Sequence, residues 1–186
     1  SNNSKLLLTV PVISKGLRDQ QICKTKINFD QDFTNKHITA IRQSYSKSKF
    51  FKLYSEEIFN ILRCKYDKLV DLNVNLIIYF CKVLNINTKI DFSSNHHFTT
   101  GGSQYLSDCC RKFNCYEYIS TIGSKNYLNK EDFEKNNIKL NYYQFEYKSY
   151  RQIGDKFLSN LSILDVLFNL GPDTINYLKE NFKILN

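Results

Sequence analysis

The spacing of hydrophobic residues along the chain predicts several amphipathic helices. Apolar side chains recur at helical intervals in residues 36–46 and 53–64. Residues 67–84 carry two neighbouring apolar stripes, so we expect this longer helix to lie at the centre of the fold. The same pattern predicts further helices over residues 103–113, 130–136, 161–170 and 173–182, and Gly171-Pro172 is typical of a helix end followed by a new start.

Short segments rich in β-branched and aromatic residues lie between these helices. They predict strands over residues 6–13, 88–92, 116–120 and 138–145. The first of these is almost continuously apolar, so we expect it to be buried. Strands that alternate with helices indicate an α/β protein: a helix-rich single domain with a small, mostly parallel or mixed sheet, spanning residues 1–186.

Composition agrees with one folded core. The 186 residues are 42% hydrophobic, which is enough to offset the entropy of ordering the chain and excludes wholesale disorder. No apolar run reaches the ~20 residues that cross a bilayer, so no membrane span is predicted. The first five residues contain no Met and no apolar signal region, and three of the six cysteines lie in apolar helical patterns; both features favour the cytoplasm.

A net charge of +8 and a pI near 9.1 favour an anionic partner. A nucleotide sugar or another anionic small molecule fits this charge. The alternative is that scattered lysines only keep an aromatic-rich surface in solution. No dense run of Lys and Arg is present, which disfavours nucleic acid as the partner, and no pattern predicts the oligomeric state.

Two glycine-containing loops are candidate anion sites. Gly101, Gly102 and Ser103 open a predicted helix, where free backbone amides and the helix dipole favour phosphate. Ser120 and Lys125 bound a loop directly after a predicted strand, where ligands collect in open α/β sheets. The two loops are therefore expected to meet in one crevice. Ordinary solvent turns are the alternative for both, since no dinucleotide or Walker pattern is present.

Lys36 and His37 open the first predicted helix. Histidine titrates near neutral pH and is a candidate general acid or base, and the adjacent Lys36 is a candidate phosphate ligand. The alternative is a surface histidine, because no partner carboxylate can be identified from the spacing.

A metal site is not predicted, and neither is a cofactor. His96 and His97 lie within twenty residues of Cys109, Cys110 and Cys115, a set that contains zinc-ligand types. The spacing has no CxxC pair, and Cys110 belongs to an apolar helix face, which favours buried thiols and loop histidines instead.

Asp165 interrupts an otherwise apolar segment near the end of the chain. A carboxylate in that setting has to be hydrogen-bonded, paired or shifted in pKa, so it is a candidate base or ligand-positioning group. Tyr150 and Gln152 are candidate hydrogen-bonding groups for a polar ligand. The alternative is that Ser162 caps the helix with Asp165 as the acidic partner of a capping box.

The ordered set of segments resembles the WbqC-like protein family of bacterial polysaccharide gene clusters. The matching segments are Leu6 to Val12, Lys36-His37, Ser44 to Lys47, Phe50-Phe51, Gly102 to Gln104 with Leu106, Tyr118 to Ser120, Tyr127-Leu128, Phe133, Asn137 to Leu140, Tyr150 to Gln152 and Leu161 to Gly171. The last segment is the most specific. Family members usually begin with a strand and a His-Gln-Pro-type motif, so the resemblance implies that this part lies ahead of Leu6.

The family is associated with lipopolysaccharide and O-antigen biosynthesis. The resemblance implies a transferase that adds an acyl or aminoacyl group to a nucleotide-activated or carrier-linked amino sugar, with His37, Asp165 and the Gly101-Gly102-Ser103 loop in one pocket. The alternative is a noncatalytic scaffold protein of the same pathway. That role predicts a large exposed aromatic patch, for which Tyr142, Tyr143 and Tyr147 are the candidates.

Overall fold

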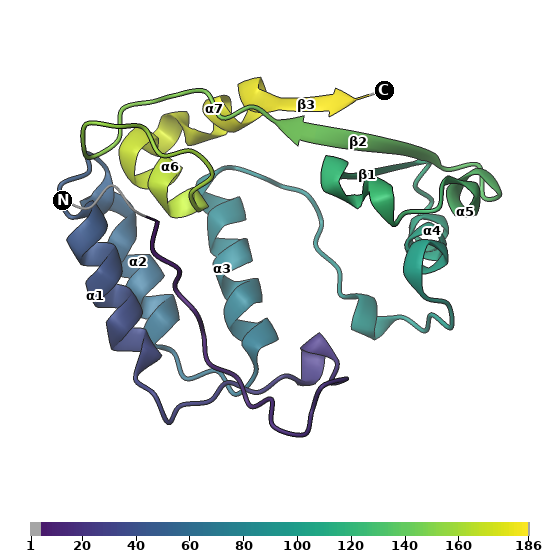
Figure 1. Ribbon diagram of the computed structural model, residues 1–186, viewed down its shortest axis with the longest axis horizontal. Helices are drawn as coiled ribbons and strands as arrows, with labels where there is room; N and C mark the ends of the chain where they lie inside the picture. The colour runs from purple at the N-terminus through teal and green to yellow at the C-terminus, as the bar shows by residue number, and fades with distance from the viewer. Residues whose placement is uncertain (1–4, 186) are drawn as a thin grey trace. The chain divides into compact units, whose positions relative to one another are not determined.

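The computed structural model describes residues 5–185, and the chain divides into two compact units (Figure 1). The first unit contains residues 5–88 and 149–176, and the second contains residues 89–148 and 177–185. The protein is a helix-rich α/β protein with a small three-stranded mixed sheet, which confirms the predicted fold class. The extent of a single domain over residues 1–186 stays a prediction.

The first unit is built from helices. They are α1 (Phe33–Tyr45), α2 (Phe51–Arg63), α3 (Leu69–Val83) and α6 (Ile163–Leu170), with the short 3₁₀ helices η1 (Ile22–Lys24) and η4 (Gly171–Asp173). The bounds of the four α-helices agree with the ranges predicted from the sequence to within three residues. The agreement is close because the apolar periodicity of a helix depends only on residues near one another in the sequence. Asp32 caps α1 by accepting a hydrogen bond from the Asn35 amide.

Aromatic side chains form the core between α2 and α6. The Phe51 and Phe168 rings lie 5.1 Å apart between centroids, and Phe168 is fully buried. The Phe50 amide donates a hydrogen bond to the Phe168 carbonyl at 3.0 Å, which ties the start of α2 to α6. Gly171 ends α6 with φ +58°, as Gly171-Pro172 predicts.

The prediction that α3 lies at the centre of the fold is wrong. Among its residues only Leu72 is fully buried, and the side chains of Ile77 and Ile78 are each about half exposed. The helix contacts α2 and η1 along one side. Ile77 and Ile78 therefore lie on an exposed side of the helix.

Two of the predicted strands do not form. Residues 6–13 are extended but make only a single bridge, Val12 with Ile27, and Leu7 is 90% exposed. Two backbone hydrogen bonds connect this segment to residues 26–28: the Ile13 amide donates to the Lys26 carbonyl, and the Asn28 amide donates to the Pro11 carbonyl. A strand needs a paired ladder, and residues 88–92 likewise have none.

The second unit contains the sheet. Its elements are η2 (Ser93–Asn95), α4 (Gly102–Lys112), β1 (Glu117–Thr121), η3 (Ile122–Asn126), α5 (Lys130–Glu134), β2 (Lys139–Phe145) and β3 (Phe182–Leu185), while α7 (Thr174–Asn181) spans the boundary between the units. The strand order is β1-β2-β3, with β1 parallel and β3 antiparallel to β2. The sequence pattern missed β3: the helix predicted over residues 173–182 includes only its first residue, and no element was predicted for residues 183–185.

One face of this sheet carries an apolar cluster. Cys110 of α4, Phe133 of α5 and Ile138 are buried together, and Tyr118 and Leu140 from the strands pack against them. Tyr118 and Phe133 stack with ring centroids 5.2 Å apart. Helices α4 and α5 therefore cover this face.

No helix between residues 5 and 185 combines the length and the apolar character that crossing a membrane requires.

Candidate functional site

The Asp165 carboxylate lies buried in the first turn of α6, only 3% exposed, and it is the centre of a hydrogen-bonded cluster. It accepts hydrogen bonds from the Tyr150 hydroxyl, from Gln152 Nε2 at 2.7 Å and from Asn169 Nδ2 at 3.4 Å. The Tyr45 hydroxyl of α1 also bonds to this carboxylate. Burial, followed by the charge of Asp165, raises the pKa of Tyr45, so its hydroxyl stays protonated and donates.

The capping alternative for Asp165 is met only in part. Ser162 does cap α6, since its Oγ accepts a hydrogen bond from the Leu164 amide at 3.3 Å. The bonds of the Asp165 carboxylate lead instead to Tyr150, Gln152 and the other members of the cluster. Its location among apolar residues is therefore explained by side-chain partners rather than by a capping box.

Gln152 joins this cluster to its own loop. Its Nε2 also donates to the Leu158 carbonyl at 2.9 Å, and its Oε1 accepts from the Leu158 amide at 2.8 Å. Both ends of the Gln152 amide are thus engaged, and the loop over residues 152–158 is closed. Tyr150 and Gln152, the predicted ligand-binding residues, both donate hydrogen bonds to Asp165, and their contact with a ligand stays a prediction.

His37 lies on the buried face of α1 and Lys36 on its exposed side. The His37 Nε2 lies 3.2 Å from the Thr9 carbonyl, an acceptor, so Nε2 carries the proton and Nδ1 is the basic nitrogen. Burial lowers the pKa of His37, which keeps the ring neutral near pH 7. His37 and Tyr45 are eight residues apart on α1, about 12 Å along the axis and about 80° around it, so the Asp165 cluster contacts α1 at a different place from His37.

The start of α4 has the features of an anion site. Gly101 is the N-cap and supplies no capping side chain, and Gly102 has φ +57°. No heavy atom lies within 4 Å of the position that a Cβ would take at either glycine. The first amides of α4 are thus uncapped and approachable, at the positive end of the helix dipole. Ser103 differs, because its Oγ accepts a hydrogen bond from the Asn129 amide at 2.8 Å.

The turn after β1 lies beside the start of α4. Ser124 Oγ is 2.7 Å from both Ser120 Oγ and the Thr121 carbonyl, which closes the turn, and Lys125 is exposed. The Leu128 amide donates to the Ser124 carbonyl at 3.0 Å, and the next amide along the chain donates to Ser103. Leu128 and Asn129 therefore connect Ser124 to Ser103 within the second unit. A crevice shared by the two loops stays a prediction.

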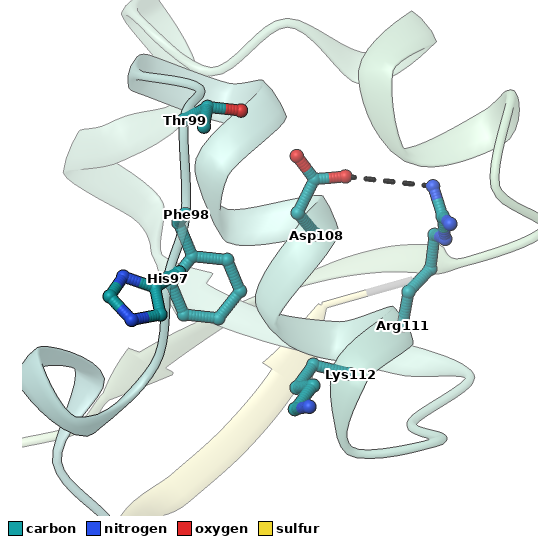
Figure 2. A pocket seen from close by; sticks show the side chains of 6 residues that line it. All are labelled: His97, Phe98, Thr99, Asp108, Arg111 and Lys112. Carbon is teal, nitrogen blue, oxygen red and sulfur yellow. Dashed lines mark ion pairs between the residues drawn. The ribbon is translucent and has the colours of Figure 1, made fainter.

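A pocket of about 310 Å³ lies on the other half of α4 (Figure 2). It is lined by His97, Phe98 and Thr99 from the segment before the helix and by Asp108, Arg111 and Lys112 from the helix itself. Figure 2 shows Asp108 paired with Arg111, whose Nη1 lies 3.7 Å from Asp108 Oδ1. Asp108 also accepts from Thr100 Oγ1 at 2.7 Å, so this carboxylate already has partners.

The residues considered for a metal site are dispersed. His96 lies 3.2 Å from the Asp91 carboxylate, and Cys110 lies in the apolar cluster, where burial raises the pKa of its thiol. In the described part of the chain no three His, Cys, Asp or Glu side chains gather in a way that could hold a metal ion. All six cysteines fall in that part and are free thiols.

The aromatic residues proposed for a scaffold surface do not form one patch. Tyr142 and Tyr143 are consecutive in β2, so their side chains point to opposite faces of the sheet. Tyr147 is about half exposed and packs against Phe145.

Two members of the Asp165 cluster were not predicted, namely Tyr45 and Asn169. Tyr45 recurs on the apolar stripe of α1, so its pattern indicated core packing only. Nothing in the local pattern links it to a carboxylate 120 residues later in the chain. Asn169 follows Asp165 by four residues on one helix, a spacing that does predict contact.

Comparison with known proteins identifies related chains. The model of the WbqC-like protein family matches residues 1–177. A relative from Mycobacterium tuberculosis, described as the uncharacterized protein Rv1507c, is 29% identical over 174 residues, which cover 92% of this chain and 75% of the relative. No solved structure matches the chain significantly.

Proposed function

Because this chain belongs to the WbqC-like protein family, we propose that it is a cytoplasmic transferase in the biosynthesis of a bacterial surface polysaccharide. It attaches a small acyl or aminoacyl group to the amino group of a nucleotide-activated sugar. Membership of the family supports the pathway. The two turns suited to anion binding, at the start of α4 and after β1, support a phosphate-containing substrate.

The observation that carries the proposal is the junction of the two turns in the second unit. The amides of Leu128 and Asn129 donate to the Ser124 carbonyl and to Ser103 Oγ, which connects the turn that contains Lys125 to the first turn of α4. Free helix amides and an exposed ammonium group together suit a diphosphate, whose oxygens accept hydrogen bonds and carry negative charge. This end of the sheet is the site proposed for the nucleotide diphosphate.

Acyl transfer to an amine needs a base in addition to a bound substrate. The amine nitrogen attacks the carbonyl carbon of the activated acyl donor, the new C–N bond forms, and the bond to the donor's leaving group breaks. The proton that the amine loses passes through a base to the leaving group. A neutral imidazole suits this role, because it accepts a proton at one nitrogen while its other nitrogen is held.

Within the first unit, His37 is the residue whose chemistry fits such a base. Its Nε2 is fixed by the Thr9 carbonyl, and burial lowers its pKa, so Nδ1 is unprotonated near neutral pH. Asp165 is assigned a positioning role, holding Tyr45, Tyr150 and Gln152 in one arrangement. These roles assign the predicted pair His37 and Asp165 to different tasks.

Binding is tested first, by thermal shift with UDP- and dTDP-linked amino sugars. A ligand that binds only the folded state raises the melting temperature, and the shift grows with the ratio of ligand concentration to Kd. We expect Lys125→Ala to reduce the shift, and Lys112→Ala, which alters the pocket of Figure 2, to leave it unchanged. A loss with Lys112→Ala alone would move the phosphate to that pocket and overturn the assignment.

Transfer is tested next, by mass spectrometry of the amino sugar after incubation with an activated acyl or aminoacyl donor. We expect a mass increase equal to the acyl group, abolished by His37→Asn while the nucleotide-dependent thermal shift persists. A wild-type protein that binds the sugar nucleotide but never modifies it, across acyl-thioester and aminoacyl donors, would contradict the transferase assignment.

A further inference from the structure

The last turn of α4 ends in a backbone motif that brings two cysteines close together. The Asn114 amide donates to the Arg111 carbonyl at 3.1 Å, and the Cys115 amide donates to the Cys110 carbonyl at 2.8 Å. Asn114 has φ +52°, the left-handed conformation that commonly follows a helix. These two bonds and the left-handed residue define a Schellman motif, in which the side chain at the position of Cys115 commonly packs back onto the last turn of the helix.

The hydrogen bond sets an upper limit on the separation of the Cys110 and Cys115 Cα atoms. A carbonyl oxygen lies about 2.4 Å from its own Cα, and an amide nitrogen lies about 1.5 Å from its own. With an N···O distance of 2.8 Å, the two Cα atoms are at most about 6.7 Å apart. Disulfides join Cα atoms that are about 4.4–6.8 Å apart, so the backbone already permits this bond.

The two thiols lie in different surroundings. Cys110 is buried in the cluster with Phe133 and Ile138, whereas Cys115 is exposed. The Cys115 Sγ lies 3.7 Å from the Phe113 carbonyl, beside the end of α4. Burial, followed by the charge of Cys115, raises the pKa of the Cys110 thiol, and this second effect requires that the two groups lie near one another. A dissolved oxidant therefore meets Cys115 first.

Cys109 is the competing partner for Cys115, because it precedes Cys110 on the same helix. Its carbonyl accepts a hydrogen bond from the Phe113 amide at 3.2 Å, and the direct backbone bond of Cys115 goes to Cys110 instead. Adjacent side chains on a helix point about 100° apart, so the two candidates face different directions. The backbone link favours Cys110.

We propose that Cys110 and Cys115 form a reversible modification site, which a small disulfide such as oxidised glutathione converts into an intramolecular disulfide. The Cys115 thiolate attacks one sulfur of the small disulfide, forms a mixed disulfide and displaces one small thiolate. Cys110 gives its proton to solvent and attacks the Cys115 sulfur, so the protein S–S bond forms and the second small thiolate leaves. Both thiolates take up protons: two protein thiols are oxidised and one small disulfide is reduced to two thiols.

The bond would close a ring over residues 110–115, between α4 and β1. Arg111 and Lys112, which line the pocket of Figure 2, lie inside this ring. A reducing compartment keeps such a pair as thiols, and a rise in small disulfides oxidises it. The end of α4 would then report the state of the thiol pool, a property that does not depend on the transferase assignment.

Tryptic mapping tests the pairing, because trypsin cuts after Arg111 and Lys112 and so separates the two cysteines. The folded protein is treated with ~0.1 mM oxidised glutathione, free thiols are alkylated, and the peptides are identified by mass spectrometry. We expect residues 90–111 and 113–125 to be joined by a bond that a phosphine reductant releases. A neighbouring thiol acts at an effective concentration of about millimolar, so the mixed disulfide at Cys115 should be about tenfold more abundant in Cys110→Ala than in the wild type.

Two further variants separate this pairing from its alternatives. Cys115→Ser changes an exposed residue, so it should abolish the link and leave the circular dichroism spectrum unchanged. Cys109→Ser is the matched control, and its link should form as in the wild type. A link that Cys109→Ser abolishes, one found only between two chains on a non-reducing gel, one that forms only in urea, or a mixed disulfide that persists in the wild type would each overturn the proposal.

Discussion

Replacing Gly171 by alanine should destabilise the first unit through two separate effects. The residue has φ +58° and ψ −125°, a conformation that side chains with a Cβ rarely adopt. Such backbone strain costs about 1–3 kcal/mol. The new Cβ would also lie 2.5–2.7 Å from three atoms of the Phe50 ring. Overpacking of this kind adds about 1–3 kcal/mol, so the free energy of unfolding should fall by about 2–6 kcal/mol in total.

Urea denaturation followed by circular dichroism measures this loss. With a dependence of about 2 kcal/mol per molar urea, the midpoint of Gly171→Ala should fall by about 1–3 M. Gly123→Ala is the matched control, since that glycine has no positive φ and no atom near its Cβ position. Its unfolding free energy should change by no more than about 0.5 kcal/mol.

A double-mutant cycle separates the two effects. In a Phe50→Ala background the clash is gone, and Gly171→Ala should cost only the strain of about 1–3 kcal/mol. An equal cost in both backgrounds would show that the ring does not meet the new methyl group. A Gly171→Ala protein as stable as the wild type would refute the reasoning altogether, including the turn geometry at the end of α6.

Three further results are expected. Asp165→Ala should lower the unfolding free energy by about 1–3 kcal/mol, because the Tyr150 hydroxyl and its neighbours lose their acceptor; an unchanged urea midpoint would contradict the cluster. Burial lowers the pKa of His37, so the unfolded chain binds more protons and stability should fall as pH drops below about 6.5. His37→Asn should flatten that dependence in melting curves at about pH 5 and 7.5, and a curve as steep as the wild type's would assign it to other groups. Burial raises the pKa of the Cys110 thiol, so alkylation mapped by mass spectrometry should modify the exposed Cys115 well before Cys110; equal rates would show that the thiol is accessible.

The helices could be predicted from the sequence because their signals are local. Periodicity and the Gly171-Pro172 pair located α1, α2, α4 and α6 to within a few residues. Strands depend on distant partners, and this is where the pattern failed. Residues 6–13 are apolar enough for a strand but find no ladder, while β3 forms only because β2 offers it an edge.

The candidate site divides along the same line. Asp165 was recognisable as an isolated carboxylate among apolar residues, and Tyr150 and Gln152 were recognised as hydrogen-bonding groups nearby. The hydrogen bonds among these three residues could not be predicted, because they depend on how the loop between Gln152 and Asp165 folds. Tyr45 could not be predicted, because its hydroxyl reaches Asp165 only after α1 and α6 pack together.

Each unit is built from two separate segments of the chain, so neither unit is complete until its second segment has been synthesised. The first unit begins with residues 5–88 but is completed by residues 149–176, and about 80 residues separate α3 from Phe168. At a synthesis rate of about 5–20 residues per second, the partner of Phe51 arrives roughly 4–16 s after the first three helices. During that interval the apolar side that these helices share is open to water, so the nascent chain is a candidate client of chaperones. Because both units are discontinuous in sequence, cleavage of a single peptide bond cannot separate one complete unit from the other.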